Sequence, residues 1–143
     1  WDQYARGTIV GITGGTTKEH LVRATLESIA YQVKDNLDVM VKDSGIPIEV
    51  MRVDGGAVVN SFLMQFQADI LGIPVDVPVI TDTTALGAAY LAAYGIGEFH
   101  DLSELEHNWK LAKRYEPQMD EETRQELMRK WHKAVERAKD WAE

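Results

Sequence analysis

The sequence predicts an α/β fold in which helices pack against a sheet. Short segments rich in β-branched residues alternate with longer segments whose apolar residues recur at helical spacing. Turn-forming glycine and proline residues separate most of these segments. Strand character is confined to residues 7–12, 48–53 and 74–78, fewer strands than a self-sufficient sheet usually contains. We therefore expect further strands of the sheet in sequence upstream of this chain.

Residues 7–12 (GTIVGI) predict a strand, which runs into the turn TGGT. Thr16, with Glu19 three residues later, has the pattern of a capping box at the start of a helix. The helix then continues through positions spaced by four: Leu21, Thr25, Ile29, Val33 and Leu37. Gly45 ends it, because glycine readily adopts the left-handed conformation of a helix cap.

The next unit is a strand, a tight turn and a helix. Residues 48–53 alternate as a strand does and lead into the turn Asp54-Gly55-Gly56-Ala57. A helix is expected from about residue 58 to residue 71, with Gly72 as its end. Its buried side should carry Phe62, Leu63, Phe66 and Ile70.

Residues 74–78 predict a short strand, and its two prolines favour an edge position or a strand end. Asp82 can cap the following helix, ALGAAYLAAYG. One face of that helix carries only small residues: Gly87, Ala88, Ala89, Ala92 and Ala93. Such a face lets a helix lie close to a sheet or to a neighbouring helix.

Residues 98–143 form a C-terminal helical tail in this interpretation. A helical turn is expected at 102–105, an extended link at 115–117, and a charged amphipathic helix from 121 to 143 capped by Asp120. The apolar stripe of that helix comprises Leu127, Trp131, Ala134, Val135 and Ala138. Three tryptophans, Trp109, Trp131 and Trp141, are expected to be packing anchors.

Composition restricts the function. The net charge of −8 argues against broad binding to nucleic acid or anionic membranes, which requires a surplus of Lys and Arg. The 143 residues include no cysteine, no long apolar run and no signal-peptide pattern, so we expect a cytoplasmic protein. The four histidines, His20, His100, His107 and His132, lack metal-ligand spacing, and no metal site is expected.

Two pieces of the chain carry a resemblance to a known family. Residues 7–12, a gap of seven residues and then residues 20–27 (HLVRATLE) resemble the second signature of the FGGY carbohydrate kinases. The pieces WDQYARG, RVDGGAVVNSFLMQFQADILG and TALGAAYLA, together with the tail 117–137, are similar to the glycerol kinases of that family. They are less similar to its xylulose, gluconate and fuculose kinases. The resemblance covers essentially the whole chain.

The resemblance implies the later part of the second ribonuclease-H-like domain of an FGGY kinase, a fold of the actin, hexokinase and Hsp70 type. Residues 1–143 would be the nucleotide-side part of this C-terminal domain. The family transfers the γ-phosphoryl group of ATP, with Mg²⁺, to a hydroxyl of its substrate, here glycerol. The implied partners are the remainder of the kinase polypeptide and, in a homo-oligomer, further copies forming a dimer or tetramer. The catalytic Asp and the polyol-binding groups are expected upstream of Trp1, which makes the chain an excised piece that is inactive alone.

The same resemblance assigns nucleotide contacts to the turn after residues 48–53. Gly56 and Asn60 occupy the positions that touch the nucleotide in the family, and Gly55 and Ala57 adjoin them. Glycine lets the main chain approach a ligand closely, and N–H groups at a helix start favour anions. Asn60, one helical turn from Gly56, can both donate and accept a hydrogen bond. From the residues alone, an ordinary strand-to-helix turn is the commoner explanation, and the resemblance reverses that preference.

Other functions stay open at this point. Asp54 could hold Mg²⁺ directly or through water, although a cap of the next turn, or an indirect role behind the groups that touch the ion, is favoured. The turn at 13–16 lacks the spacing of a phosphate-binding P-loop. The chain could instead be a free-standing regulatory or protein-interaction module that uses exposed helical faces, or part of a sibling sugar kinase.

Overall fold

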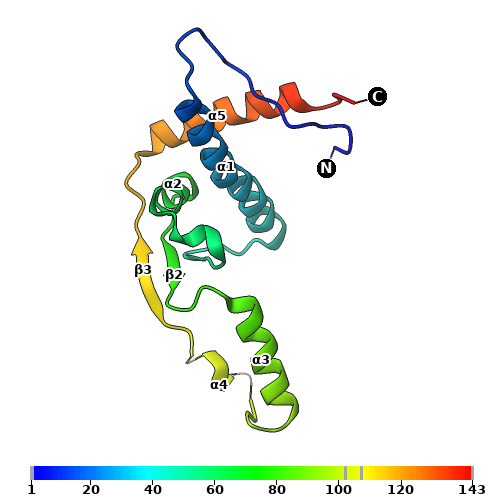
Figure 1. Ribbon diagram of the computed structural model, residues 1–143, viewed down its shortest axis with the longest axis vertical. Coiled ribbons are helices and arrows are strands. Elements are labelled where there is room, and N and C mark those ends of the chain that lie inside the picture. Colours follow the sequence, from blue (N-terminus) through cyan, green and yellow to red (C-terminus); the bar gives the residue numbers. More distant parts are fainter. Residues whose placement is uncertain (1, 102, 107, 143) are drawn as a thin grey trace.

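The computed structural model describes residues 2–101, 103–106 and 108–142. In chain order its elements are α1 (Lys18–Ser44), β1 (Met51–Arg52), the 3₁₀ helix η1 (Gly56–Val59), α2 (Ser61–Leu71), β2 (Val75–Pro78), α3 (Thr83–Gly95), α4 (Ser103–Glu106), β3 (Leu111–Tyr115) and α5 (Glu121–Ala138). Figure 1 shows α1 and α5 at one end of an elongated molecule and α3 and α4 at the other. None of the described helices is long and apolar enough to span a membrane.

The sheet has the order β1-β2-β3 within the described residues. β1 pairs with β2 in parallel, with Met51 opposite Val75. β3 pairs with β2 in antiparallel fashion, with Tyr115 opposite Val75. α2 packs on this sheet, and α1 packs on α2, which confirms the predicted layered α/β arrangement.

A single core joins the helices to the sheet. Its buried apolar residues are Ala30, Tyr31, Leu37, Val58, Leu63, Met64, Phe66, Ala68, Ile70, Leu71, Val75, Val77, Tyr115 and Met128. Half of them belong to α2 or to η1 directly before it, so α2 is the central element of the fold. Ile70 and Val75 are fully buried where α2 meets β2. The expected burial of Leu63, Phe66 and Ile70 is confirmed. Phe62 is 40% exposed: it lies in the first turn of α2, where Arg23 of α1 lies over its ring and Phe66 stacks with it.

The helix ends follow local chemistry, with one correction. α1 begins after Thr17, not Thr16. The Nδ1 atom of His20 accepts a hydrogen bond from the N–H of Thr17 at 3.1 Å, so His20 takes the role expected of Glu19. The hydroxyl Oγ1 of Thr16 instead accepts a hydrogen bond from the N–H of Thr13 at 2.9 Å, which closes the preceding turn. Gly45 ends α1 in the left-handed region with φ of 68°.

The strands required more correction than the helices. Residues 7–12 form no strand: they lie apart from the sheet, and Ile9 and Ile12 are 66% and 63% exposed. A strand is stable only when its backbone groups are paired, and no described strand lies beside this segment. Residues 48–53 yield only the two-residue β1, which is the edge strand of the described sheet and pairs with β2 alone. β2 is the central strand and not an edge strand; Pro78 stands at its end.

The third strand, β3, was not predicted, and it lies within the segment 98–143 expected to be helical. Four of the five residues Leu111–Tyr115 are exposed and two of them are charged, so they lack the apolar alternation of a half-buried strand. Leu102 lies outside the described residues, and the helical turn expected there is α4. The last helix is confirmed with its Asp120 cap, which accepts from the N–H of Thr123 at 2.8 Å, but it ends at Ala138.

α3 forms as predicted, and it is not buried against the rest of the described chain. All of its residues are described, and none is buried. The small-residue face therefore has no sheet or helix against it, and α3 projects beyond the carboxyl end of β2 (Figure 1). Of the expected packing anchors, Trp131 stacks on Tyr31 with ring centroids 5.3 Å apart, whereas Trp141 is 68% exposed.

Candidate functional site

The predicted nucleotide-binding turn lies at the carboxyl end of β1. Because β1 and β2 are parallel, their carboxyl ends meet at one edge of the sheet, where open α/β sheets bind ligands. Gly55 follows with φ of 85° and ψ of 178°, a conformation open to glycine alone. Its N–H donates to the carbonyl of Thr81 at 2.8 Å. Gly55 thus joins the turn to the loop after β2, and its own N–H is not available to a ligand.

Gly56 and Ala57 are the exposed part of this turn. Val58 and Asn60 donate their N–H groups to the carbonyls of Gly55 and Ala57, at 3.3 and 3.1 Å. The N–H groups of Gly56 and Ala57 have no recorded acceptor among the described residues. No atom lies within 4 Å of the position that a Cβ on Gly56 would occupy. Two main-chain donors without a recorded acceptor therefore lie in the exposed part of the turn, and we call residues 55–57 the ledge.

Asn60 has a role that the sequence analysis missed. It is the N-cap of α2, and its Oδ1 atom accepts a hydrogen bond from the N–H of Leu63 at 3.1 Å. Its Nδ2 group makes no recorded hydrogen bond to the described residues, so this half of the half-buried amide is free to donate to a ligand. The sequence did contain the signal, because Asn directly before a helical apolar pattern is among the commonest N-caps.

Asp54, directly before the ledge, does not cap its turn as expected. Its side chain is exposed and takes part in no recorded hydrogen bond of the described residues. The described part of the chain also contains no group of three His, Cys, Asp or Glu side chains placed to hold a metal ion. Within the described residues, the carboxylate of Asp54 therefore has no recorded hydrogen-bond donor and belongs to no metal-binding group.

Charged side chains cross the sheet beside the ledge. Arg114 on β3 donates two hydrogen bonds to Asp76 on β2, from Nε at 2.6 Å and from Nη2 at 2.7 Å. Asp76 is only 4% exposed, and these bonds lower the pKa of its carboxyl group. Arg52, at the end of β1, stacks over Trp109 with its Cζ 4.4 Å from the ring centroid. Trp109 is thereby held at the same edge of the sheet as the ledge.

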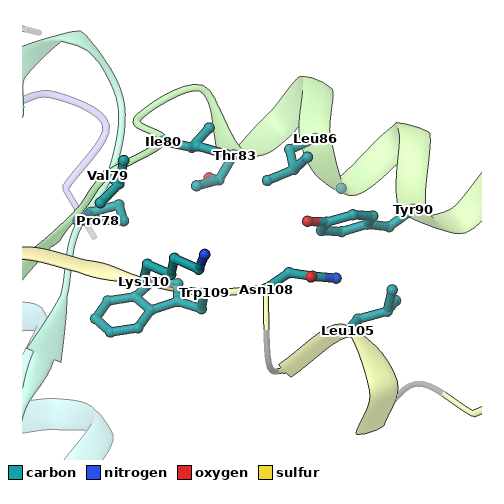
Figure 2. A pocket seen from close by; sticks show the side chains of 11 residues that line it. Pro78, Val79, Ile80, Thr83, Leu86, Tyr90, Leu105, Asn108, Trp109 and Lys110 are labelled. Carbon is teal, nitrogen blue, oxygen red and sulfur yellow. The ribbon is translucent and has the colours of Figure 1, made fainter.

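A cavity of about 530 Å³ also opens at this edge, between α3 and the segment before β3 (Figure 2). None of Gly55, Gly56, Ala57 and Asn60 lines it. Thr81 connects the ledge to the cavity. Its carbonyl accepts the hydrogen bond from the N–H of Gly55, and Ile80 and Thr83, close to it in the chain, line the cavity. Sequence reasoning did not find this cavity, since its walls come from three segments that local periodicity does not connect.

Comparison with known proteins gives a consistent result. Residues 1–96 match the FGGY family of carbohydrate kinases, C-terminal domain. A glycerol kinase of Pseudothermotoga lettingae is 60% identical over 143 residues, which are 100% of this chain and 29% of the relative. The crystal structure of a Plasmodium falciparum glycerol kinase with ADP superposes with a TM-score of 0.83 at 35% identity, covering 96% of this chain and 28% of that one.

A xylulose kinase from Rhodospirillum rubrum is less similar. Its TM-score is 0.73 at 26% identity, and the match covers 92% of this chain and 27% of the other. The chain thus spans 29% of the length of a curated relative that it matches over all its residues. The solved structures are sugar kinases with the same arrangement of elements, which supports the predicted fold class.

Proposed function

The chain belongs to the FGGY family of carbohydrate kinases, and from this membership we propose that it forms the nucleotide-side, C-terminal part of a glycerol kinase. The proposed reaction moves the γ-phosphoryl group of ATP to a terminal hydroxyl of glycerol, giving sn-glycerol 3-phosphate and ADP. One observation carries the proposal: the match to a glycerol kinase at 60% identity extends over the whole chain, ledge included. A xylulose kinase at 26% identity is far less similar, so the sibling sugar kinase is not favoured.

In the proposed enzyme, the ledge positions the nucleotide. The N–H groups of Gly56 and Ala57 are free to donate to acceptor atoms of ATP, and the absence of a Cβ at Gly56 lets the ligand come close to the main chain. Asn60 contributes its Nδ2 group, while its Oδ1 atom holds the start of α2. Phosphoryl transfer depends on positioning and on charge neutralisation, and this chain supplies the first of these.

The other catalytic elements belong, in this proposal, to the remainder of the kinase polypeptide. A carboxylate there accepts the proton of the attacking glycerol hydroxyl. Mg²⁺ would neutralise charge on the phosphates, but the described residues offer no three-ligand group, so we assign no Mg²⁺ ligand to this chain. The 143-residue chain alone is therefore expected to show no turnover with ATP, glycerol and Mg²⁺. Glycerol 3-phosphate formation above a no-protein blank would contradict this.

The uncovered apolar surfaces fit a location inside a larger protein. Ile9, Val10 and Ile12 are more than half exposed, and so is Leu91 on α3. Exposed apolar surface of this extent usually marks an interaction site. We propose that the remainder of the kinase covers it, with residues 7–12 completing a sheet. We also propose that the complete kinase is cytoplasmic. It would form a homo-oligomer, either a dimer or a tetramer.

The test uses the longer kinase polypeptide that contains this chain. Glycerol phosphorylation should be detected, and Gly56→Val should raise the KM for ATP by roughly tenfold or more, because a side chain now occupies the approach to the ledge. The KM for glycerol should stay unchanged. Gly95→Val is the matched control, since Gly95 is exposed and open space surrounds its Cα.

Two results would contradict the proposal at different levels. An unmodified polypeptide that phosphorylates xylulose or gluconate and not glycerol would refute the substrate. A Gly56→Val variant with an unchanged KM for ATP would refute the assignment of the ledge and leave the family membership intact.

A further inference from the structure

The cavity beside α3 is built from two walls that face each other (Figure 2). Leu86 and Tyr90 of α3 lie on one side, and Trp109 and Lys110, directly before β3, lie on the other. Ile80, in the loop after β2, closes one end. The volume of about 530 Å³ falls in the range of roughly 300–1,000 Å³ typical of small-molecule sites.

Both aromatic rings in the walls are held by contacts outside the cavity. The guanidinium of Arg52 lies over the ring of Trp109 at 4.4 Å. Tyr90 meets Phe99 edge to face, with ring centroids 6.2 Å apart and an interplanar angle of 87°. A ring that already has such a contact loses less conformational entropy when a ligand binds.

The polar groups of the cavity are few, and one of them is charged. The ammonium of Lys110 and the hydroxyl of Tyr90 point into the space between the walls (Figure 2). Lys110 takes part in no recorded ion pair or side-chain hydrogen bond of the described residues, and no Asp or Glu lines the cavity. Asp82, next to the lining residue Thr83, turns its carboxylate to the first turn of α3, where it accepts from the N–H of Ala85 at 3.4 Å. Among the residues that the structure describes, the lining therefore carries one positive charge, Lys110, without a recorded carboxylate partner.

We propose that this cavity is a binding site for a small aromatic carboxylate. The carboxylate would accept hydrogen bonds from Lys110 and Tyr90, and the ring would lie against Trp109, Leu86 and Ile80. A cavity with apolar walls and one cation favours such a monoanion over a neutral molecule of equal size, because its charge is neutralised on binding. The proposal does not depend on the proposed kinase function, since none of the ledge residues lines the cavity.

Calorimetric titration of the 143-residue chain with 3-phenylpropionate tests the charge preference. The carboxylate should bind roughly tenfold more tightly than 3-phenylpropionamide, which has the same ring and chain but no charge. Equal affinities, or no binding of either compound, would overturn the proposal.

Two pairs of variants test the location. Lys110→Met should weaken 3-phenylpropionate binding roughly tenfold, whereas Lys113→Met should not, because the ammonium of Lys113 lies over Tyr115 outside the cavity. Gly87→Leu places a side chain in the cavity and should abolish binding. Gly95→Leu makes the same change in the same helix away from the cavity and should bind normally. Both leucines favour the helix, so α3 is retained. Binding that persists in Gly87→Leu refutes the site.

A competition experiment separates this site from the nucleotide site. In the longer kinase polypeptide, saturating ADP should leave 3-phenylpropionate binding in place. Displacement by ADP would assign the cavity to nucleotide binding and overturn the proposal. A polypeptide that binds 3-phenylpropionate but phosphorylates no glycerol would refute the proposed function alone.

Discussion

Two regions of the chain have equally regular helices but very different packing. In the core region, residues 18–78 and 111–138, α1, α2, α5 and the sheet share the buried apolar residues. In the arms, residues 2–17 and 79–110, no described residue belongs to the buried core. Large apolar side chains in the arms, such as Ile9, Leu91 and Ile96, are 65–80% exposed. The difference lies in tertiary burial and not in local structure.

The comparison shows which interactions stabilise each region. α3 has an alanine-rich sequence and an Asp82 cap, and these local terms suffice to define a helix. They do not attach it to the core, because attachment requires apolar surface removed from water. The core should therefore unfold cooperatively, whereas α3 should open locally at much lower free energy.

The largest expected effect compares Ile70 with Leu91. Ile70 is fully buried in α2, and Ile70→Ala should lower the free energy of unfolding by about 3 kcal/mol through lost burial and a residual cavity. Leu91, in α3, is 65% exposed, and Leu91→Ala should change it by less than about 0.5 kcal/mol. Urea denaturation followed by circular dichroism measures both. Similar losses for the two variants would show that α3 belongs to the cooperative unit.

The second comparison concerns two aspartates. Asp76→Asn removes a carboxylate that accepts two hydrogen bonds from Arg114 and should cost about 2 kcal/mol; solvent screening of Arg114, which is 43% exposed, limits the figure. Asp82→Asn in the arm keeps a capping side chain and should be neutral in the same denaturation experiment. Equal effects would contradict the separation of the two regions.

The same pair gives a pH dependence. Hydrogen bonds from Arg114 hold the pKa of Asp76 in the folded chain below its usual value of 3.8. A depressed folded pKa means that the stabilisation is complete above the unfolded value and is lost as pH falls through the folded value. The urea midpoint should therefore decline below about pH 4, and Asp76→Asn should flatten part of that decline. An unchanged profile in Asp76→Asn would refute this assignment.

Local sequence chemistry predicted the core helices well. The end of α1 at Gly45, the end of α2 at Gly72 and the Asp120 cap of α5 were all correct, because each depends on a few adjacent residues. The strands were not predictable in this way. β3 is exposed at four of its five residues and lacks a strand pattern, and it is a strand because β2 pairs with it. Residues 7–12 have a strand sequence but no partner strand among the described residues.

The same distinction between adjacent residues and distant contacts applies to the candidate site. The turn Asp54-Gly55-Gly56 could be located because it is a contiguous pattern, and Gly55 has the positive φ that glycine allows. Its nucleotide contacts came from the family resemblance and stay a prediction. The use of the Gly55 N–H by Thr81 was not predictable, since it depends on the parallel pairing of β1 and β2. The cavity depends on contacts between distant segments, such as Arg52 with Trp109, and no local pattern encodes these.

A third comparison uses two glycines with positive φ. Gly72→Ala should cost about 1.5 kcal/mol, because φ is 73° and the new Cβ would lie 2.1 Å from Nη1 of Arg124 unless the guanidinium moves. Gly97, in the arm, has φ of 84° but open space around it, so Gly97→Ala should destabilise only the end of α3. Adding Arg124→Ala to Gly72→Ala should recover part of the loss, in a double-mutant cycle based on urea midpoints. A cycle without coupling would show that backbone strain alone is responsible.

The smallest expected effect compares two tryptophans that the sequence treated alike. Trp131 stacks on Tyr31 and donates from Nε1 to Asp35 at 2.7 Å, which joins α5 to α1. Trp131→Phe keeps an aromatic ring there but removes the donor, so it should cost about 1 kcal/mol in urea denaturation. Trp141 lies past the end of α5 and is 68% exposed, so Trp141→Phe should be neutral. A neutral Trp131→Phe would mean that stacking alone holds α5 to α1, and the core region would then owe its cohesion to apolar contact without help from this hydrogen bond.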